Sequence, residues 1–258
     1  MRFFVRFSYD GAPYHGWQIQ PNGITVQEVM QNAFSIVMRR EVELTAAGRT
    51  DTGVHARMMV AHFDLQDGEL STETQRQHLL SRLNSLLPST IALHEIFPVA
   101  PDAHARFSAV ARTYEYHVVT HKDPFLQGRA VRIPADSDFA AMNEAAKYLL
   151  VTEDFGSFCK LHTDVNNTLC KVSEAQWTEL QAGHYVFRIT ANRFLRNMVR
   201  AIVGTLFDVG MHKTSIEDFK NIIDKQHRTA AGNSAPAEGL YLVNIDYPPD
   251  IASQNQIP

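Results

Sequence analysis

The chain has 258 residues, of which 45% are hydrophobic and 20% are charged, and this ordinary globular composition excludes collagen, coiled coils and extensive disorder. The formal net charge of −4 argues mildly against a protein dedicated to nucleic acids, although a local patch can differ in sign from the whole. Because no apolar run reaches membrane-spanning length, no signal peptide is visible and only two cysteines, Cys159 and Cys170, are present, we expect a soluble cytoplasmic protein without a disulfide scaffold.

The first hundred residues are predicted to form four strands and two helices. In the first strand Phe3, Val5, Phe7 and Tyr9 share one face. In the first helix apolar residues recur with the i, i+3, i+4 spacing of a buried stripe, behind a candidate capping box at Thr25 and Glu28. The resulting order β-α-β-β-α-β is that of a split βαβ unit. The predicted strands span residues 2–10, 42–47, 58–65 and 90–97, and the predicted helices span residues 26–39 and 73–87.

The second half follows a connector at residues 98–102 and resembles the first half in pattern. Its last predicted helix follows a candidate capping signal at Thr214 and Glu217. The predicted strands span residues 112–119, 170–180, 185–191 and 239–247, and the predicted helices span residues 137–150, 195–207 and 216–223.

These elements predict an α+β protein. Two split βαβ halves, of the ferredoxin or RRM-like kind, join into a mostly antiparallel sheet with helices on one side. We expect an N-terminal half over residues 1–100, a C-terminal half over residues 101–247 and a frayed tail over residues 248–258. Two such halves leave a central cleft, which is a usual place for a site.

The loop at residues 48–56, between two predicted strands, concentrates residues of chemical interest. Glycines bracket Asp51, so the backbone can bend and let a ligand approach closely. Arg49 lies close by in the sequence, and a guanidinium near a carboxylate favours its ionised form. An ionised, positioned aspartate is a nucleophile or a base, whereas the alternative for this segment is a polar hairpin loop with an incidental ion pair.

Two short matches to known catalytic triplets fail on their context. Asp-Thr-Gly at residues 51–53 matches the aspartic-protease triplet, but that chemistry needs two carboxylates and the chain has one copy. Asp-Phe-Gly at residues 154–156 matches a protein-kinase triplet, but neither a glycine-rich loop nor a His-Arg-Asp loop accompanies it. We treat the second match as chance and keep a dimeric hydrolase as a rival to be tested.

Two further segments mix cationic and aromatic side chains. Residues 104–116 interleave His, Arg, Phe and Tyr at the entry to a strand, which suits contact with phosphates and bases and equally suits a half-buried strand with a solvated edge. Arg193, Arg196 and Arg200 follow helical spacing, and such a basic face fits a phosphate backbone or a solvated stripe. The histidines show no metal-ligand spacing, so we predict no metal.

Several separated motifs together carry a resemblance to a known family. They are Tyr-Asp-Gly at residues 9–11, Tyr-His-Gly-Trp-Gln at 14–18, Val-Gln-Glu at 26–28, Gly-Arg-Thr-Asp-Thr-Gly-Val-His-Ala at 48–56 and, further along, residues 104–109, 114, 154–158, 194–204 and 238–242. In these motifs and in their order, the chain resembles the TruA-type tRNA pseudouridine synthases over nearly its whole length.

The resemblance implies the pseudouridine synthase fold and the isomerisation of uridine to pseudouridine at positions 38, 39 and 40 of the tRNA anticodon stem-loop. It implies no metal, no organic cofactor and a homodimer in which one tRNA contacts both subunits. It places the nucleophile on Asp51, its partner on Arg49, which also fills the space left by the flipped base, and the active-site tyrosine on Tyr114. It places RNA contacts on the segment that holds His104, Arg106 and Phe107 and on a loop near His162.

Three chemical paths stay open for Asp51. It can add to C6 of the uracil, add to C1′ of the ribose, or remove a proton to give a glycal. In each path the N1–C1′ bond breaks and C5 bonds to C1′, after the base has left the stack at a cost of roughly a few kcal/mol. Tyr114 then stacks on the uracil and is a candidate for the deprotonation of C5.

Two rivals belong to other functional classes. A non-catalytic RNA-binding module with a split βαβ fold explains the basic and aromatic segments but leaves Arg49 and Asp51 without a role. A dimeric hydrolase that uses Asp51 would be indifferent to RNA. Release of tritium from tRNA labelled at uridine C5 distinguishes the synthase from both.

Overall fold

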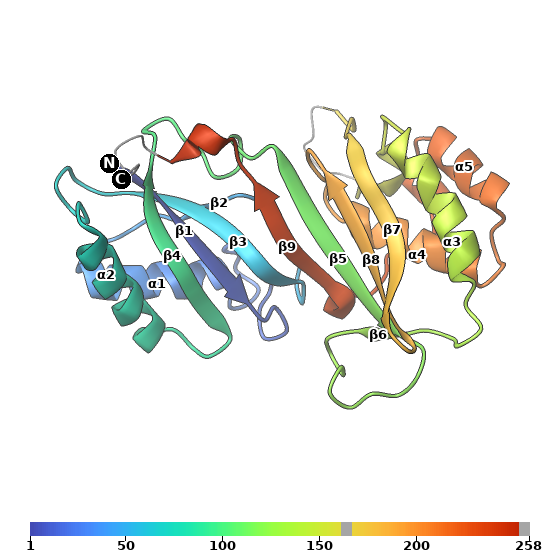
Figure 1. The fold of residues 1–258 in the computed structure, drawn as a ribbon, viewed down its shortest axis with the longest axis horizontal. Coiled ribbons are helices and arrows are strands. Elements are labelled where there is room, and N and C mark those ends of the chain that lie inside the picture. The colour runs from blue at the N-terminus through green and yellow to red at the C-terminus, as the bar shows by residue number, and fades with distance from the viewer. Residues whose placement is uncertain (161–166, 253–258) are drawn as a thin grey trace. The chain divides into compact units, whose positions relative to one another are not determined.

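The fold is taken from a computed structural model of the chain, which describes residues 1–160 and 167–252. The chain divides into two compact units. The first unit comprises Met1–Val110 together with the described residues from Leu242 onward, and the second comprises Ala111–Tyr241. Figure 1 shows the helices and strands of each unit, coloured along the chain.

The first unit follows the order β-α-β-β-α-β and gains a further strand from the end of the chain (Figure 1). Most of that last strand belongs to this unit, because the boundary falls at Leu242. Its elements are β1 (Arg2–Tyr9), α1 (Val26–Met38), β2 (Thr45–Ala46), β3 (His55–Asp64), α2 (Glu73–Leu86), β4 (Ile91–Val99) and β9 (Leu240–Asp246).

The strands of the first unit run in the order β4-β1-β3-β9, and β2 pairs with β3. β1 pairs antiparallel with both β3 and β4, which makes it a central strand. Its neighbours Phe3 and Phe4 point to opposite faces of the sheet and are both fully buried. Both faces of this sheet are therefore covered.

Each face of the first sheet has its own cover. On the Phe3 side, Phe34 of α1 places its ring 5.1 Å from Phe63 of β3 in an edge-to-face contact. Helix α2 contacts α1 and therefore lies on the same side. On the other side Phe4 meets Tyr247, with the ring centroids 5.2 Å apart. The segment that follows β9 thus packs on the sheet face that α1 and α2 do not cover.

Both helices of the first unit begin at a threonine cap. Thr25 Oγ1 accepts a hydrogen bond from the Glu28 amide at 3.4 Å, which confirms the predicted start of α1. Helix α2 has a complete capping box that the sequence analysis did not identify, because the Thr72 and Gln75 side chains each accept from the other residue's amide.

The second unit contains a three-stranded antiparallel core. Its strands run in the order β5-β8-β7, and a short strand, β6, lies parallel to β5. Its elements are β5 (Ala111–Val119), β6 (Val131–Arg132), α3 (Phe139–Ala146), β7 (Val172–Gln181), β8 (His184–Ala191), α4 (Met198–Gly210) and α5 (Ile216–Asp224).

The second sheet has one apolar face and one polar face. Trp177 of β7 contacts Phe139 of α3 and Phe207 of α4, with ring centroids 5.5 and 6.1 Å apart, so both helices cover the same face. The opposite face carries an ion pair across β5 and β8, in which Arg188 donates to Glu115 at 2.6 Å. This alternation is expected of an antiparallel sheet that is buried on one side.

The predicted α+β class, with mostly antiparallel strands, is confirmed. Some boundaries were wrong. The strand predicted at residues 42–47 is reduced to the two residues of β2. The helix predicted from residue 195 begins at Met198, because Asn197 adopts a left-handed conformation with φ 65°. The last helix is capped by Ser215, whose Oγ accepts from the Asp218 amide at 3.0 Å, rather than by Thr214.

We expected the halves to divide after residue 100 and the tail to begin at residue 248. In the structure, the residues up to Val110 and those described after residue 247 both belong to the first unit. The Val110 amide donates to Asp246 O at 2.8 Å, which ties the chain before β5 to the end of β9. Of the tail expected to be frayed, Pro249–Ile251 form a short 3-10 helix, and Ala252 bridges to Val99. Residues 253–258 of that tail lie outside the described residues.

Candidate active site

Asp51 lies in the loop that joins β2 to β3. The Val54 amide donates to the Asp51 carbonyl oxygen at 3.1 Å and closes a turn. Gly53 in this turn has φ 77°, a conformation that favours glycine. The Asp51 side chain is half-buried, whereas Arg49 is exposed. Asp51 is therefore partly accessible to solvent on a turn of defined shape.

The segment between β1 and α1, residues 9–17, supports the Asp51 loop. The Trp17 amide donates to Thr50 O at 3.2 Å, and the Gly53 amide donates to Tyr14 O at 3.4 Å. The Tyr9 and Thr50 hydroxyls share a hydrogen bond of 2.8 Å. The loop is thus held by both backbone and side chain of this support segment.

Two glycines let the support segment approach the Asp51 loop closely. A β-carbon on Gly11 would stand 2.0 Å from Val54 O, and one on Gly16 would stand 2.4 Å from Thr50 O. Real β-carbons do not come that close to a carbonyl oxygen. Glycine at both positions is therefore a condition of this packing.

His55 fixes the start of β3 against the end of β1. Its buried Nδ1 accepts a hydrogen bond from the Gly11 amide at 3.1 Å and lies 3.0 Å from the Asp10 carboxylate. Asp10 in turn accepts from the Ala12 amide at 3.0 Å. The downstream end of the Asp51 loop is therefore anchored in the same support segment as its upstream end.

The predicted RNA-contacting residues His104, Arg106 and Phe107 form a tight turn in the first unit. His104 Nδ1 accepts from the Arg106 amide at 3.1 Å, and Ser108 Oγ accepts from the His104 amide at 2.9 Å. Phe107 is 76% exposed, and the Arg106 guanidinium lies 5.6 Å from its ring centroid. The turn presents one aromatic ring and one cation to solvent.

His62 of β3 is hydrogen-bonded to the backbone of this turn. Its Nδ1 accepts a hydrogen bond from the Ala105 amide at 3.2 Å, and its ring lies 4.6 Å from that of His104. Burial, with the charges of Arg2 and His104, lowers the pKa of His62 to about 4, and burial followed by Arg2 lowers the pKa of His104. Both imidazoles are therefore neutral near pH 7 and able to accept hydrogen bonds.

The remaining predicted site residues belong to the second unit. Tyr114 of β5 is half-buried, and its ring meets Phe194 edge-on at 5.0 Å. Arg193 donates to Asn167 Oδ1 at 3.2 Å, and Arg200 Nε donates to Ala235 O at 2.7 Å. His162 lies outside the described residues.

The expectation that three arginines share one helical face was wrong. Arg193 and Arg196 precede α4, which begins at Met198, and only Arg200 is in the helix. The left-handed Asn197 separates the two groups, so the spacing of the arginines is not a helical spacing. Arg196 is exposed, while Arg193 and Arg200 are half-buried.

Asn192 is an organising residue that sequence reasoning missed. Its Oδ1 accepts from the Lys171 and Arg193 amides at 2.8 and 2.9 Å, and its carbonyl accepts from the Arg112 guanidinium at 2.9 Å. A single asparagine directly after a strand carries no sequence signal for such a network. Tyr9, Thr50, His55 and His62 were missed as individual residues for the same reason, because each acts on a segment far away in the chain.

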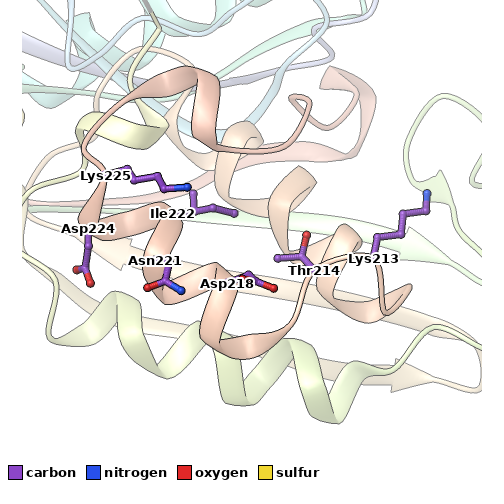
Figure 2. Close-up of a pocket in the computed structure, with 7 residues that line it drawn as sticks. All are labelled: Lys213, Thr214, Asp218, Asn221, Ile222, Asp224 and Lys225. Atoms are coloured by element: carbon purple, nitrogen blue, oxygen red, sulfur yellow. The ribbon is translucent and has the colours of Figure 1, made fainter.

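A surface hollow lies around α5 in the second unit. Figure 2 shows that the side chains lining it come from the start and the body of that helix and from the residues just before and after it. It includes no predicted site residue. Its lining residues are Lys213, Thr214, Asp218, Asn221, Ile222, Asp224 and Lys225.

The described residues contain no cluster of three or more His, Cys, Asp or Glu side chains that could hold a metal ion. Cys159 and Cys170 are buried thiols, and burial raises the pKa of Cys170 to about 11. None of the helices in residues 1–160 and 167–252 is long and apolar enough to cross a bilayer.

Comparison with known proteins assigns the chain to a family. The sequence model of the family described as tRNA pseudouridine synthase matches residues 6–108 and 145–248. The chain belongs to the tRNA pseudouridine synthase family. The predicted resemblance is thereby confirmed, and the family is one of isomerases. The matched stretches include the Asp51 loop, its support segment and the turn at residues 104–107.

Individual relatives from this family align along almost the whole chain. A protein of Bacteroides fragilis named tRNA pseudouridine synthase A is 50% identical over 250 residues, which is 97% of this chain and 98% of the relative. Proteins of the same name from Bacteroides thetaiotaomicron and Bacillus subtilis are 51% and 40% identical, and cover 98% and 96% of this chain and 93% and 99% of their own lengths.

Proposed function

We propose that this tRNA pseudouridine synthase family member converts uridine to pseudouridine at positions 38, 39 and 40 of the tRNA anticodon stem-loop, with Asp51 as the nucleophile. The observation that carries the proposal is a half-buried carboxylate on a loop whose backbone is hydrogen-bonded on both sides of it. An enzyme that acts on a flipped base needs a reacting group held in one place, because small displacements of that group cost rate.

The proposed reaction balances within the substrate. The N1–C1′ bond breaks, a C5–C1′ bond forms, C5 loses its proton and N1 gains one. No electrons leave the substrate, so an oxidant, a reductant or an organic cofactor is not required. Asp51 serves this outcome by adding to C6, by adding to C1′ or by taking the proton that gives a glycal, and all three routes use the same carboxylate.

Arg49 is assigned to extrusion of the target base. Its guanidinium is exposed on the same loop as Asp51. A long, cationic side chain at that position suits entry into the space that the flipped uridine leaves and contact with the neighbouring phosphates.

Tyr114 is assigned to the uracil ring. Its edge-to-face contact with Phe194, at 5.0 Å, restricts the orientation of the ring before substrate arrives. A restricted aromatic ring loses little entropy when it stacks on a base. The same side chain is our candidate for assisting the deprotonation of C5.

RNA contacts are assigned to both units. Phe107 and Arg106 offer an exposed ring and an exposed cation, which suit stacking and phosphate binding, and His104 shapes the turn that carries them. The further assigned residues are Arg193, Arg196 and Arg200, with His162 on the expected loop.

Assembly and location complete the proposal. Family membership supports a homodimer in which one tRNA contacts both subunits, and a cytoplasmic location where tRNA is modified. The oligomeric state is checked by light scattering with and without tRNA, and a protein that stays monomeric in both conditions contradicts the homodimer.

The deciding experiment uses unmodified tRNA that carries tritium at uridine C5. We expect the wild-type protein to release tritium into water and Asp51→Asn to release none, while a gel shift shows that the variant still binds tRNA. Asp67→Asn is the matched control, because its carboxylate is 93% exposed beside the N-terminus of the same unit.

Two results would change the assignment. Release by a folded Asp51→Asn at the wild-type rate would remove Asp51 from the nucleophile role. Binding of tRNA by the wild-type protein with no release of tritium would indicate the non-catalytic RNA-binding module.

A further inference from the structure

The main chain on both sides of Asp51 is fixed by hydrogen bonds. Upstream, Thr50 O accepts from the Trp17 amide at 3.2 Å. Downstream, Asp51 O accepts from the Val54 amide at 3.1 Å. The two peptide groups that flank the aspartate are therefore held in place by the fold.

The Thr50 side chain makes a further contact, with a buried residue of β1. Its hydroxyl shares a hydrogen bond of 2.8 Å with the Tyr9 hydroxyl. Tyr9 is 4% exposed and Thr50 is 8% exposed, so water cannot readily replace either partner. Loss of one hydroxyl leaves the other buried without this bond.

Tyr9 is a rigid anchor for this bond. It is the last residue of β1, and its ring stacks against Phe7 with the centroids 6.1 Å apart. β1 is hydrogen-bonded to strands on both sides. The position of the Tyr9 hydroxyl is therefore set by the centre of the first sheet and transmitted to the residue next to Asp51.

We infer that Tyr9 is a positioning residue for the nucleophile, and that it acts through the Thr50 hydroxyl. This inference rests on the proposed role of Asp51. Tyr9 does not touch the substrate in this scheme, so its loss slows the chemical step and leaves the affinity for tRNA unchanged. A displacement of about 1 Å in a reacting group can cost on the order of 100-fold in rate, and we expect a smaller loss from one hydrogen bond.

The test measures tritium release in single turnover with excess enzyme, together with the tRNA dissociation constant from a gel shift. Tyr9→Phe keeps the packed ring, and Thr50→Val keeps the shape of the threonine, but each removes one hydroxyl. We expect each variant to be slowed about tenfold with an unchanged dissociation constant. The double variant should be no slower than either, because both changes break the same bond. Thr50→Ser, which keeps the hydroxyl, should restore the wild-type rate.

The matched control separates positioning from general stability. Tyr241→Phe removes a tyrosine hydroxyl that donates to Arg129 O at 2.8 Å within the second unit. We expect it to lower the melting temperature about as much as Tyr9→Phe does and to leave the single-turnover rate unchanged. Equal rates for Tyr9→Phe and Tyr241→Phe would overturn the inference, as would a slow Thr50→Ser.

Failure of this inference is distinguishable from failure of the proposed function. If Asp51→Asn is inactive while Tyr9→Phe and Thr50→Val both react at the wild-type rate, Asp51 keeps its role and Tyr9 loses its own. If Asp51→Asn is active, the proposed nucleophile is wrong and the positioning role falls with it.

Discussion

The carbonyl oxygen of Thr50 lies 2.4 Å from the point where a β-carbon on Gly16 would stand. Gly16 also has φ +83°, a conformation that L-residues with side chains rarely adopt. Space and backbone conformation thus exclude other residues at the same position. Since Thr50 precedes Asp51 directly, this close approach bears on the residue proposed to do the chemistry.

Gly16→Ala is expected to destabilise the first unit and to slow the reaction. The left-handed conformation alone costs a residue with a β-carbon roughly 1–2 kcal/mol, and the contact with Thr50 O adds to that cost. Urea unfolding and tritium release measure the two effects. Gly48→Ala is the stability control, because a β-carbon there meets nothing within 4 Å. Equal stability of the two variants would contradict the close approach.

The stability of the protein is expected to fall as the pH drops from 6.5 towards 4, in part through His62. The pKa of His62 is lowered to about 4 in the folded state, first by burial and then by Arg2. In that window the unfolded chain binds a proton that the folded chain does not, so the free energy of unfolding decreases, on the order of 1 kcal/mol by pH 5.

Urea unfolding of His62→Gln at pH 7 and pH 5 checks this prediction. Glutamine does not titrate, and its amide oxygen can still accept a hydrogen bond from the Ala105 amide. The difference in stability between the two pH values should therefore be smaller in the variant. The same difference in both proteins would show that protonation of His62 is not involved.

Phe107→Ala is expected to weaken tRNA binding without loss of stability. The ring is 76% exposed, so little buried surface is lost, while stacking on a base is worth roughly 1–3 kcal/mol. A gel shift and a thermal melt measure the two quantities. Phe125→Ala is the control, because Phe125 is 90% exposed between β5 and β6 and has no assigned role. Equal affinities of both variants would exclude stacking by Phe107.

Arg196→Ala is expected to weaken tRNA binding and to flatten its dependence on salt. Each phosphate contact releases counterions, so loss of one contact should reduce the slope of log affinity against log salt by about 0.7 to 0.9. The exposed Lys147, whose ammonium pairs with Glu144 at 2.6 Å, provides the control Lys147→Ala. An unchanged slope for Arg196→Ala would remove it from the RNA interface.

Local signals predicted the fold well wherever the structure obeys local rules. Helix α1 follows its apolar stripe and its Thr25 cap, and ends at Arg39 in a left-handed conformation. Prediction failed where one backbone torsion decides the outcome. The left-handed Asn197 delays α4 to Met198, and no pattern of apolar residues reports a torsion angle.

The candidate site was predictable as a loop but not as a packed assembly. Glycine, arginine and aspartate close together in the sequence draw attention to residues 48–56 without any knowledge of the fold. The contacts that hold the Asp51 loop join Thr50 to Tyr9 and Gly16, and Val54 to Gly11. Pairs so far apart in the sequence become visible only when the sheet is formed. The same holds for His62 beneath the turn at residues 104–107.

Because the first unit takes its last strand from beyond the second unit, it cannot be completed in the order in which the chain is synthesised. β9 lies next to β3, yet its residues Leu242–Asp246 follow the whole of the second unit in the chain. A ribosome that has just finished Val110 has therefore made a first sheet with one neighbour missing, and the bond from the Val110 amide to Asp246 cannot yet form. The domain that carries the proposed nucleophile reaches its complete hydrogen-bonded form only after the second unit has been synthesised.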